Sequence, residues 1–106
     1  MHELLKRMLA EYLQAFGHPT RIEILQLLRS KDEMCVCEIV EELKKDQSNI
    51  SRHLNALKGV GIVQFRSEGV RSFYKVKNDD VYKIIELVKS ILQRQAKEGQ
   101  KILEAF

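Results

Sequence analysis

Aromatic side chains are scarce in this chain of 106 residues: they make up 7% of it, and tryptophan is absent. A chain of this length is expected to form one domain, so we treat residues 1–106 as a single unit. A small domain buries only a limited part of its surface, and large rings contribute strongly to cores. The scarcity of aromatic residues therefore favours a fold that needs a partner subunit.

Long apolar runs are also missing, since no stretch approaches the ~20 residues that a membrane-spanning helix needs. The N-terminus carries Glu3 and Glu11, and it lacks the apolar segment and cleavage site of a signal peptide. We therefore expect a cytoplasmic protein. In that compartment the only two cysteines, Cys35 and Cys37, should be thiols or metal ligands rather than a structural disulfide.

The hydrophobic periodicity predicts a mainly α-helical chain with one small β-hairpin. Apolar residues at helical spacing mark helices over residues 4–16, 19–29, 36–43, 47–58 and from 79 toward 103, with a polar turn at 30–33. Two β-rich runs flank Glu68-Gly69 and predict a hairpin over 62–77. This order is typical of a winged helix-turn-helix, with residues 36–58 as the helix-turn-helix and 62–77 as the wing.

The segment from Asp46 to Lys58 predicts a recognition helix capped by Asp46. Ile50, Leu54 and Leu57 form a narrow apolar stripe, while the other positions carry mostly amides, hydroxyls and a guanidinium. An amide can make two hydrogen bonds to adenine, arginine can make two to guanine, and serine hydroxyls bond either bases or phosphates. We expect one face of this helix to pack on the core and the other to read DNA.

The positive charge is concentrated around this segment. Residues 44–77 contain eight basic and two acidic residues, an excess of +6, so that the rest of the chain, with 10 basic and 13 acidic residues, carries −3. A basic face on a mildly acidic body is the electrostatic footprint of a nucleic-acid binder.

The two terminal segments, residues 1–16 and 79–106, carry more apolar side chains than a core of this size should absorb. We expect these helices to pair two subunits into a homodimer. A two-fold dimer places two recognition helices in successive major grooves about 34 Å apart, so the DNA partner should be a double-stranded operator with an inverted repeat.

The chain resembles the ArsR/SmtB family of winged-helix repressors, and the likeness covers nearly all of it. The motifs that carry the resemblance are Gly17-His18-Pro19-Thr20-Arg21 with Ile24-Leu25, Gln47 to Leu54 with Leu57, Gly61-Ile62-Val63, Glu68-Gly69 with Phe73-Tyr74, and Cys35 to Ile39. The resemblance implies a dimeric repressor that leaves DNA when it binds a metal ion or undergoes thiol chemistry.

The expected DNA contacts combine the polar face of the recognition helix with basic residues around it. They are Lys44, Lys45, Gln47, Ser48, Asn49, Ser51, Arg52, His53, Asn55, Lys58, Arg66 and Arg71. The lysines and the two wing arginines should contact phosphates, so binding should weaken steeply with salt.

Cys35 and Cys37 are the expected sensor. They lie about 200° apart around a regular helix, so they can hold one ion only if the backbone is irregular or the first cysteine precedes the helix. Soft thiolates suit Zn, Cd, Cu(I) or trivalent arsenic. The arsenic-sensing pattern has a third cysteine where this chain has Val40; His2 is the candidate third ligand, and a linear Cu(I) site would need none.

Three alternatives stay open at this stage. Oxidation or persulfide chemistry could be the signal instead of a metal, because activated thiols are readily oxidised. The cysteines could also be small buried core residues. The domain could bind a protein rather than DNA. We expect no catalytic residues, since the chain lacks a phosphate-binding glycine loop, a dinucleotide pattern and an assembled nucleophile–base pair.

Overall fold

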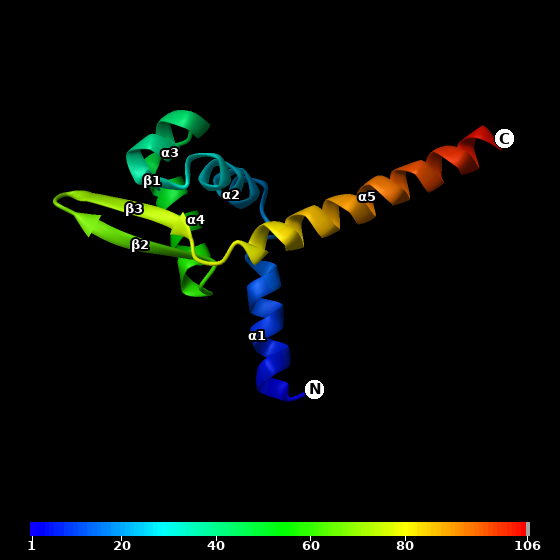
Figure 1. The fold of residues 1–106 in the computed structure, drawn as a ribbon, viewed down its shortest axis with the longest axis horizontal. Coiled ribbons are helices and arrows are strands. Elements are labelled where there is room, and N and C mark those ends of the chain that lie inside the picture. Colours follow the sequence, from blue (N-terminus) through cyan, green and yellow to red (C-terminus); the bar gives the residue numbers. More distant parts are fainter. Residues whose placement is uncertain (106) are drawn as a thin grey trace.

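A computed structural model describes residues 1–105, so the last residue of the predicted 79–106 segment lies outside the described part. The helices are α1 (Glu3–Gln14), α2 (Pro19–Lys31), α3 (Val36–Leu43), α4 (Gln47–Gly59) and α5 (Asp80–Glu104). The strands are β1 (Glu33–Cys35), β2 (Val63–Glu68) and β3 (Arg71–Val76). Figure 1 shows the order of a winged helix-turn-helix, which confirms the predicted fold class.

The sheet has one strand more than the predicted hairpin. Its order is β1-β3-β2, and both pairs are antiparallel. In β1, Glu33 pairs with Lys75 and Cys35 pairs with Phe73. Glu33 therefore lies in a strand, and the prediction that it belongs to a polar turn is wrong. A three-residue strand that pairs about forty positions along the chain leaves no local pattern of alternation to detect.

The wing turn is made by Gly69 and Val70, between the paired residues Glu68 and Arg71. Gly69 has φ 61°, and a positive φ at the first of two turn residues is what a type II′ hairpin requires. A side chain at Gly69 would be strained even though nothing crowds the position.

The core lies where α2, α3 and α4 meet the sheet. Fully buried side chains come from all three helices and from the strands, and they include Ile24, Leu25, Ile39, Ile50, Leu54, Leu57, Met34 and Val63. We call this part, residues 15–82, the body. Within the body, one face of α4 packs against the core and the opposite face is exposed to solvent.

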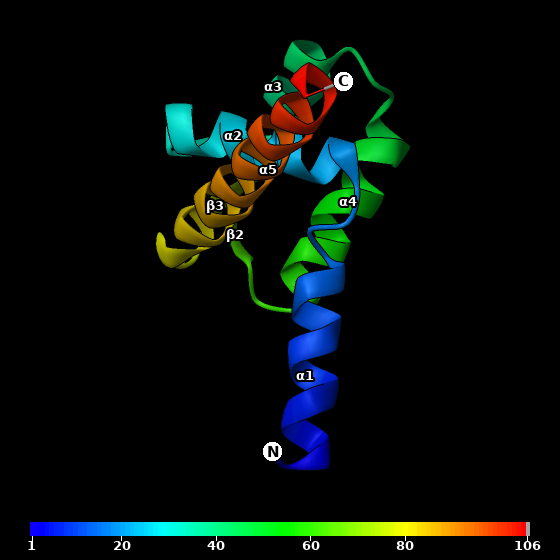
Figure 2. The ribbon, with the colours of Figure 1, turned by 90° about the vertical axis from the view of Figure 1, so that its right-hand side faces the viewer.

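The two terminal helices extend from the body as arms, α1 in one direction and α5 in another (Figures 1 and 2). The molecule measures 62 Å along its longest axis. α1 buries none of its residues, whereas α5 is anchored by Val81 and Tyr82 at its start, where the Tyr82 hydroxyl donates to the Leu25 carbonyl at 2.9 Å. Within residues 1–105, no helix is both long and apolar enough to cross a membrane.

Candidate nucleic-acid interface and thiol pair

The turn between α3 and α4 is set by two residues. Lys44 ends α3 in the left-handed conformation, with φ 53° and ψ 46°. Asp46 then caps α4, since its Oδ1 accepts hydrogen bonds from the Asn49 backbone N–H and from the Ser48 hydroxyl, both at 2.8 Å. These bonds, the backbone one first, lower the pKa of Asp46. The predicted cap is confirmed, and it defines where α4 begins after the turn.

The two faces of α4 differ as predicted. Ile50, Leu54 and Leu57 are completely buried. The opposite side is exposed, and it carries Gln47, Ser48, Arg52, Asn55 and Lys58. Within residues 1–105, the side chains of Arg52 and Asn55 form no hydrogen bond or ion pair, so their donors are available to a ligand.

Three positions on α4 are less exposed than the expected DNA contacts require. His53 is 3% exposed, so its predicted role at the DNA surface is wrong: it lies three residues after Ile50 and four before Leu57, on the apolar stripe. This spacing in the sequence could have predicted that His53 is buried. Asn49 and Ser51 are half-buried at the edges of the exposed face, and the Asn49 Oδ1 is buried without a partner.

Four basic residues near α4 keep their charges accessible. Lys44 and Arg71 are exposed, and Lys45 is half-buried. The Lys58 ammonium lies 4.2 Å from the centre of the Phe65 ring, a cation–π contact that joins α4 to the wing.

Arg66 is exposed, and ion pairs hold it to neighbouring residues of the sheet. Its guanidinium pairs with Glu33 at 2.8 Å and with Glu68 at 2.7 Å, and it lies 4.6 Å from the centre of the Phe73 ring. The hydrogen bond from Arg66 lowers the pKa of Glu33, and the same pairing raises the pKa of Arg66. These ion pairs connect β2 to β1, and the phosphate contact expected of Arg66 stays a prediction.

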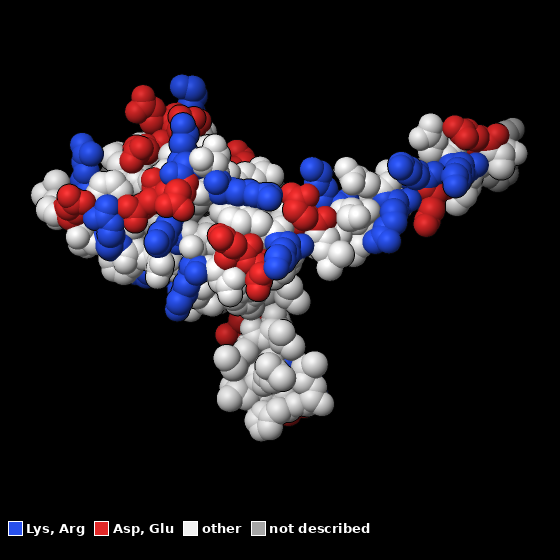
Figure 3. All heavy atoms as spheres, in the orientation of Figure 1, with Lys and Arg blue, Asp and Glu red and all other residues white. Residues whose placement is uncertain are grey.

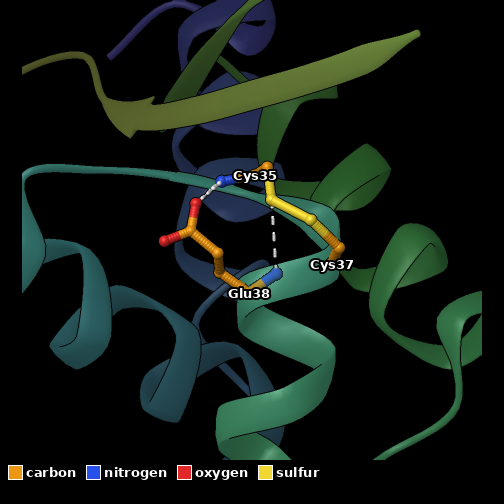
Figure 4. Close-up of a disulfide and its surroundings, with 3 residues drawn as sticks. All are labelled: Cys35, Cys37 and Glu38. Atoms are coloured by element: carbon orange, nitrogen blue, oxygen red, sulfur yellow. Dashed lines mark hydrogen bonds between the residues drawn. A yellow bond between two sulfur atoms is a disulfide. The ribbon is translucent and has the colours of Figure 1, made fainter.

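Cys35 precedes α3 and caps it. Its backbone is extended, with φ −79° and ψ 159°, and its Sγ accepts from the Glu38 N–H at 3.3 Å while Glu38 Oε1 accepts from the Cys35 N–H at 3.0 Å. Because the first cysteine lies outside the helix, its sulfur can meet that of Cys37. The two sulfurs are joined in a disulfide (Figure 4), which corrects the expectation of free thiols.

The disulfide lies between the two elements predicted to contact DNA. Cys35 is 1% exposed, whereas Cys37 is exposed. A groove beside the pair is lined from three directions, by α3, by the start of α4 and by the wing tip; its residues are Cys35, Val36, Cys37, Gln47, Val70, Arg71 and Ser72. A chemical change at the sulfurs can therefore reach α4 and the wing directly.

The predicted third ligand is not near this pair within one chain. His2 lies at the free end of α1, where its Nδ1 accepts from the Leu4 N–H at 3.1 Å, while the cysteines lie in the body at the junction of β1 and α3 (Figure 1). Among residues 1–105, no group of three or more His, Cys, Asp or Glu side chains is placed to hold a metal ion.

Comparison with known proteins gives consistent matches. The model of a family of bacterial regulatory proteins, the arsR family, matches residues 18–64, from α2 into β2. A helix-turn-helix transcriptional regulator from Methanocaldococcus jannaschii is 54% identical over 79 residues, which are 74% of this chain and 89% of that protein. A cadmium resistance transcriptional regulatory protein, a CadC homologue from Staphylococcus aureus, is 30% identical over 77 residues, covering 73% of this chain and 64% of that protein.

The solved structures agree with these sequence matches. The solution structure of a homodimeric winged helix-turn-helix DNA-binding domain from Mycobacterium bovis has a TM-score of 0.75 and 30% identity to this chain. The match covers 85% of this chain and 82% of that domain. The similarity thus extends beyond the helix-turn-helix to most of the fold.

Proposed function

Because the chain belongs to the arsR family of bacterial regulatory proteins, we propose that this transcriptional regulator is a homodimeric repressor whose grip on DNA is controlled at Cys35 and Cys37. Its relatives and its fold are those of transcriptional regulators, not of enzymes. The observation that carries the proposal is the exposed polar face of α4, which is backed by a fully buried stripe and flanked by the wing.

The proposed DNA surface uses Gln47, Ser48, Arg52 and Asn55 for bases, with Asn49 and Ser51 at its edges. Lys44, Lys45, Lys58 and Arg71 contact phosphates. The Ser48 hydroxyl donates to Asp46 in the free protein, so it must release Asp46 before it can donate to DNA. Lys58 and Arg71 connect the helix contacts to the wing.

The proposed dimer forms through the arms. α1 exposes Leu4, Leu5, Met8, Leu9 and Leu13, each at 43% or more, although these residues are large and apolar. Figure 3 shows that α1 bears almost no charge on the side it presents in that view. An apolar groove runs along the junction with α5, between Leu13, Phe16 and Ile22 on one side and Ile85, Val88 and Leu92 on the other. Such a surface favours a partner helix.

A two-fold dimer built this way presents two copies of α4 to one side of a duplex. We therefore propose an inverted-repeat operator with half-sites about 34 Å apart, one helical turn of DNA. The solved relative from Mycobacterium bovis is homodimeric, which supports the same assembly here.

One form of the signal is a thiophilic metal or metalloid ion. The reduced pair offers two soft sulfur donors, which suit Zn, Cd, Cu(I) or arsenite, and a relative is named for cadmium resistance. Two donors fit a linear site; a three-donor site needs a ligand from outside the local chain, and His2 of the second subunit is the candidate. When bound, the ion would link the two sulfurs without an S–S bond.

Thiol oxidation is the second candidate, and the disulfide favours it. The two thiols give up two protons and two electrons to a peroxide, and an S–S bond forms between the sulfurs. Hydrogen peroxide is thereby reduced to two water molecules, and an organic hydroperoxide to an alcohol and one water molecule. Because the pair lines a groove with Gln47 and Arg71, either form of the signal would act on the first residue of α4 and on the wing tip.

The test is a gel-shift titration of the reduced protein on the DNA upstream of its own gene, with Zn, Cd, Cu(I), arsenite or a peroxide added in turn. We expect binding that weakens steeply with salt, and release by one of these agents. In the double variant Cys35→Ser with Cys37→Ser, binding should persist and release should be lost.

Val36→Ala is the matched control, because it changes the residue between the two sulfurs and keeps both of them. It should respond to the same agent as the wild type. Release of the serine double variant by every agent that releases the wild type would remove the sensor assignment, whereas absent or salt-insensitive binding to duplex DNA would favour a protein-binding module.

A further inference from the structure

Arg21 joins the end of α1 to the recognition helix. From α2, its Nε donates to Nδ1 of His53 on α4 at 3.1 Å, and its Nη1 donates to the carbonyl of Ala15, which caps α1, at 3.4 Å. Ala15 is itself buried, at 4% exposed. One guanidinium thus links the base of an arm to the buried side of α4.

A second histidine completes this arrangement. The His18 ring lies against the His53 ring, with centroids 4.2 Å apart, and His18 Nδ1 accepts from the Thr20 N–H at 3.3 Å to cap α2. Both imidazoles therefore act as hydrogen-bond acceptors at Nδ1. A protonated imidazole has no acceptor nitrogen, so protonation of His53 breaks its bond with Arg21.

The surroundings oppose protonation of His53. The charged and titratable groups that act on it are His18 at the α1–α2 junction, Arg21 on α2, Lys45 in the turn before α4, and Arg52 on α4. Burial first, and these groups second, lower the pKa of His53.

We propose that Arg21, His18 and His53 form a lock that positions α4 relative to the base of the α1 arm, and that this lock holds only while the His53 imidazole is neutral. Acidification then loosens the buried side of α4, and operator affinity falls. The proposal rests on DNA binding by α4, and it adds a positioning role for residues that do not touch DNA.

The sign of this effect distinguishes it from simple electrostatics. Protonating histidines adds positive charge to the protein, which by itself strengthens binding to a polyanion. The lock predicts the opposite: binding that weakens as the pH falls. An unlinked histidine near DNA cannot produce that result.

The experiment measures operator affinity at fixed ionic strength from about pH 7.5 to about pH 5.5, with the ordinary imidazole pKa inside the interval. We expect the wild type to lose on the order of tenfold in affinity, which is within the range of an ordinary coupling free energy. His53→Asn keeps an acceptor for Arg21 and does not titrate, so it should bind well at the higher pH and lose much less at the lower one.

Two further variants test the role of Arg21 and control for unrelated effects of pH. Arg21→Gln removes the guanidinium, so it should bind weakly at the higher pH and show a flattened pH profile. Glu23→Gln is the matched control: Glu23 lies on α2 two residues after Arg21, but it is exposed and faces away from the lock, so this variant should keep the wild-type profile.

A readout without DNA separates this proposal from the repressor proposal. In the free protein, NMR titration should give His53 a pKa below its ordinary value, and the Arg21 Nε–H resonance should shift as His53 titrates. Equal or tighter operator binding at the lower pH, or an Arg21 Nε–H that ignores the titration of His53, would overturn the lock. Absence of DNA binding at every pH would count against the repressor alone.

Discussion

The body and the arms of this molecule treat apolar side chains in opposite ways. In the body, Leu54 and Ile24 are completely buried, and the sheet and three helices surround them. On the arms, Met8 and Leu92 are 57% and 58% exposed, although they are equally apolar. Burial of one such side chain contributes about 1.5–3 kcal/mol of favourable free energy. The exposed apolar side chains of the arms therefore favour association with another surface.

This difference separates two tasks. The body is complete within one chain, and it fixes the shape of the reading surface. The arms leave apolar side chains exposed within one chain, and in the proposed dimer they set the distance between two reading surfaces. We therefore expect changes in the body to alter the stability and intrinsic binding of each subunit, and changes in the arms to alter assembly.

The largest expected effect is in the body. Leu54→Ala removes a fully buried side chain beneath the reading face and should lower the free energy of unfolding by about 2–5 kcal/mol. Urea unfolding should show this loss at every protein concentration. A loss that vanishes at high protein concentration would mean that α4 depends on assembly for its packing.

The matching change in the arms is Leu92→Glu, at a residue that lines the apolar groove on α5. A charge cannot be buried there without a partner, so the dimer should dissociate at concentrations where the wild type is assembled, while the helix content stays the same. Analytical ultracentrifugation and circular dichroism measure the two properties. Glu86→Gln, on the same helix outside the groove, is the control; an unchanged dimer in Leu92→Glu would show that the arms do not form the interface.

The next effect concerns the reading surface itself. Arg52→Ala removes an exposed guanidinium from α4 and should cost about 1–3 kcal/mol of specific operator binding if it reads a base. Competition between operator and random duplex separates this loss from a general loss of charge. Arg66→Ala provides the contrast: since Arg66 is held by Glu33 and Glu68, its loss should destabilise the wing and leave base preference unchanged.

A smaller effect is the pH dependence of stability. The pKa of His53 is lowered in the folded protein, so the unfolded chain binds more protons in the interval below the ordinary histidine value of about 6.5. The contribution of neutral His53 to the free energy of unfolding is therefore fully present above that pH. It declines as the pH falls toward the pKa of His53 in the folded protein. Thermal melts should show a falling Tm over this interval in the wild type and a flatter profile in His53→Asn. An identical fall in both proteins would assign the dependence to other groups.

The smallest effect is the loss of a single phosphate contact. Lys58→Gln should weaken binding about equally for all DNA sequences and reduce the slope of log affinity against log salt by about 0.9. Lys97→Gln, on the α5 arm, should leave the slope unchanged. A wild-type slope in Lys58→Gln would show that this lysine serves only its contact with Phe65.

The local patterns in the sequence predicted most of the fold. Helical spacing marked α1 to α5, Asp46 was recognised as a cap, and Glu68-Gly69 indicated the wing turn. These features depend on neighbours in sequence. β1 could not be found in this way, because its three residues acquire their structure by pairing with β3, far along the chain.

The candidate site was predicted less completely, for the same reason. The position of His53 on the apolar stripe was visible from its spacing to Ile50 and Leu57, but its partner Arg21 lies 32 residues away. The ion pair between Arg66 and Glu33 was not predicted, because the two residues lie 33 positions apart in the sequence. The condition that Cys35 precede the helix is met, but the expectation of free thiols was wrong, because the sequence did not show that the two sulfurs lie within bonding distance.

Sedimentation of the protein with a fluorescent duplex that carries the inverted repeat, beside a duplex that carries one half-site, tests the central claim most directly. We predict two chains bound to the full operator at low concentration, and much weaker binding to the half-site. One chain bound with equal affinity to both duplexes, or no bound protein at low salt, would contradict the claim that the arms pair two α4 reading surfaces on DNA.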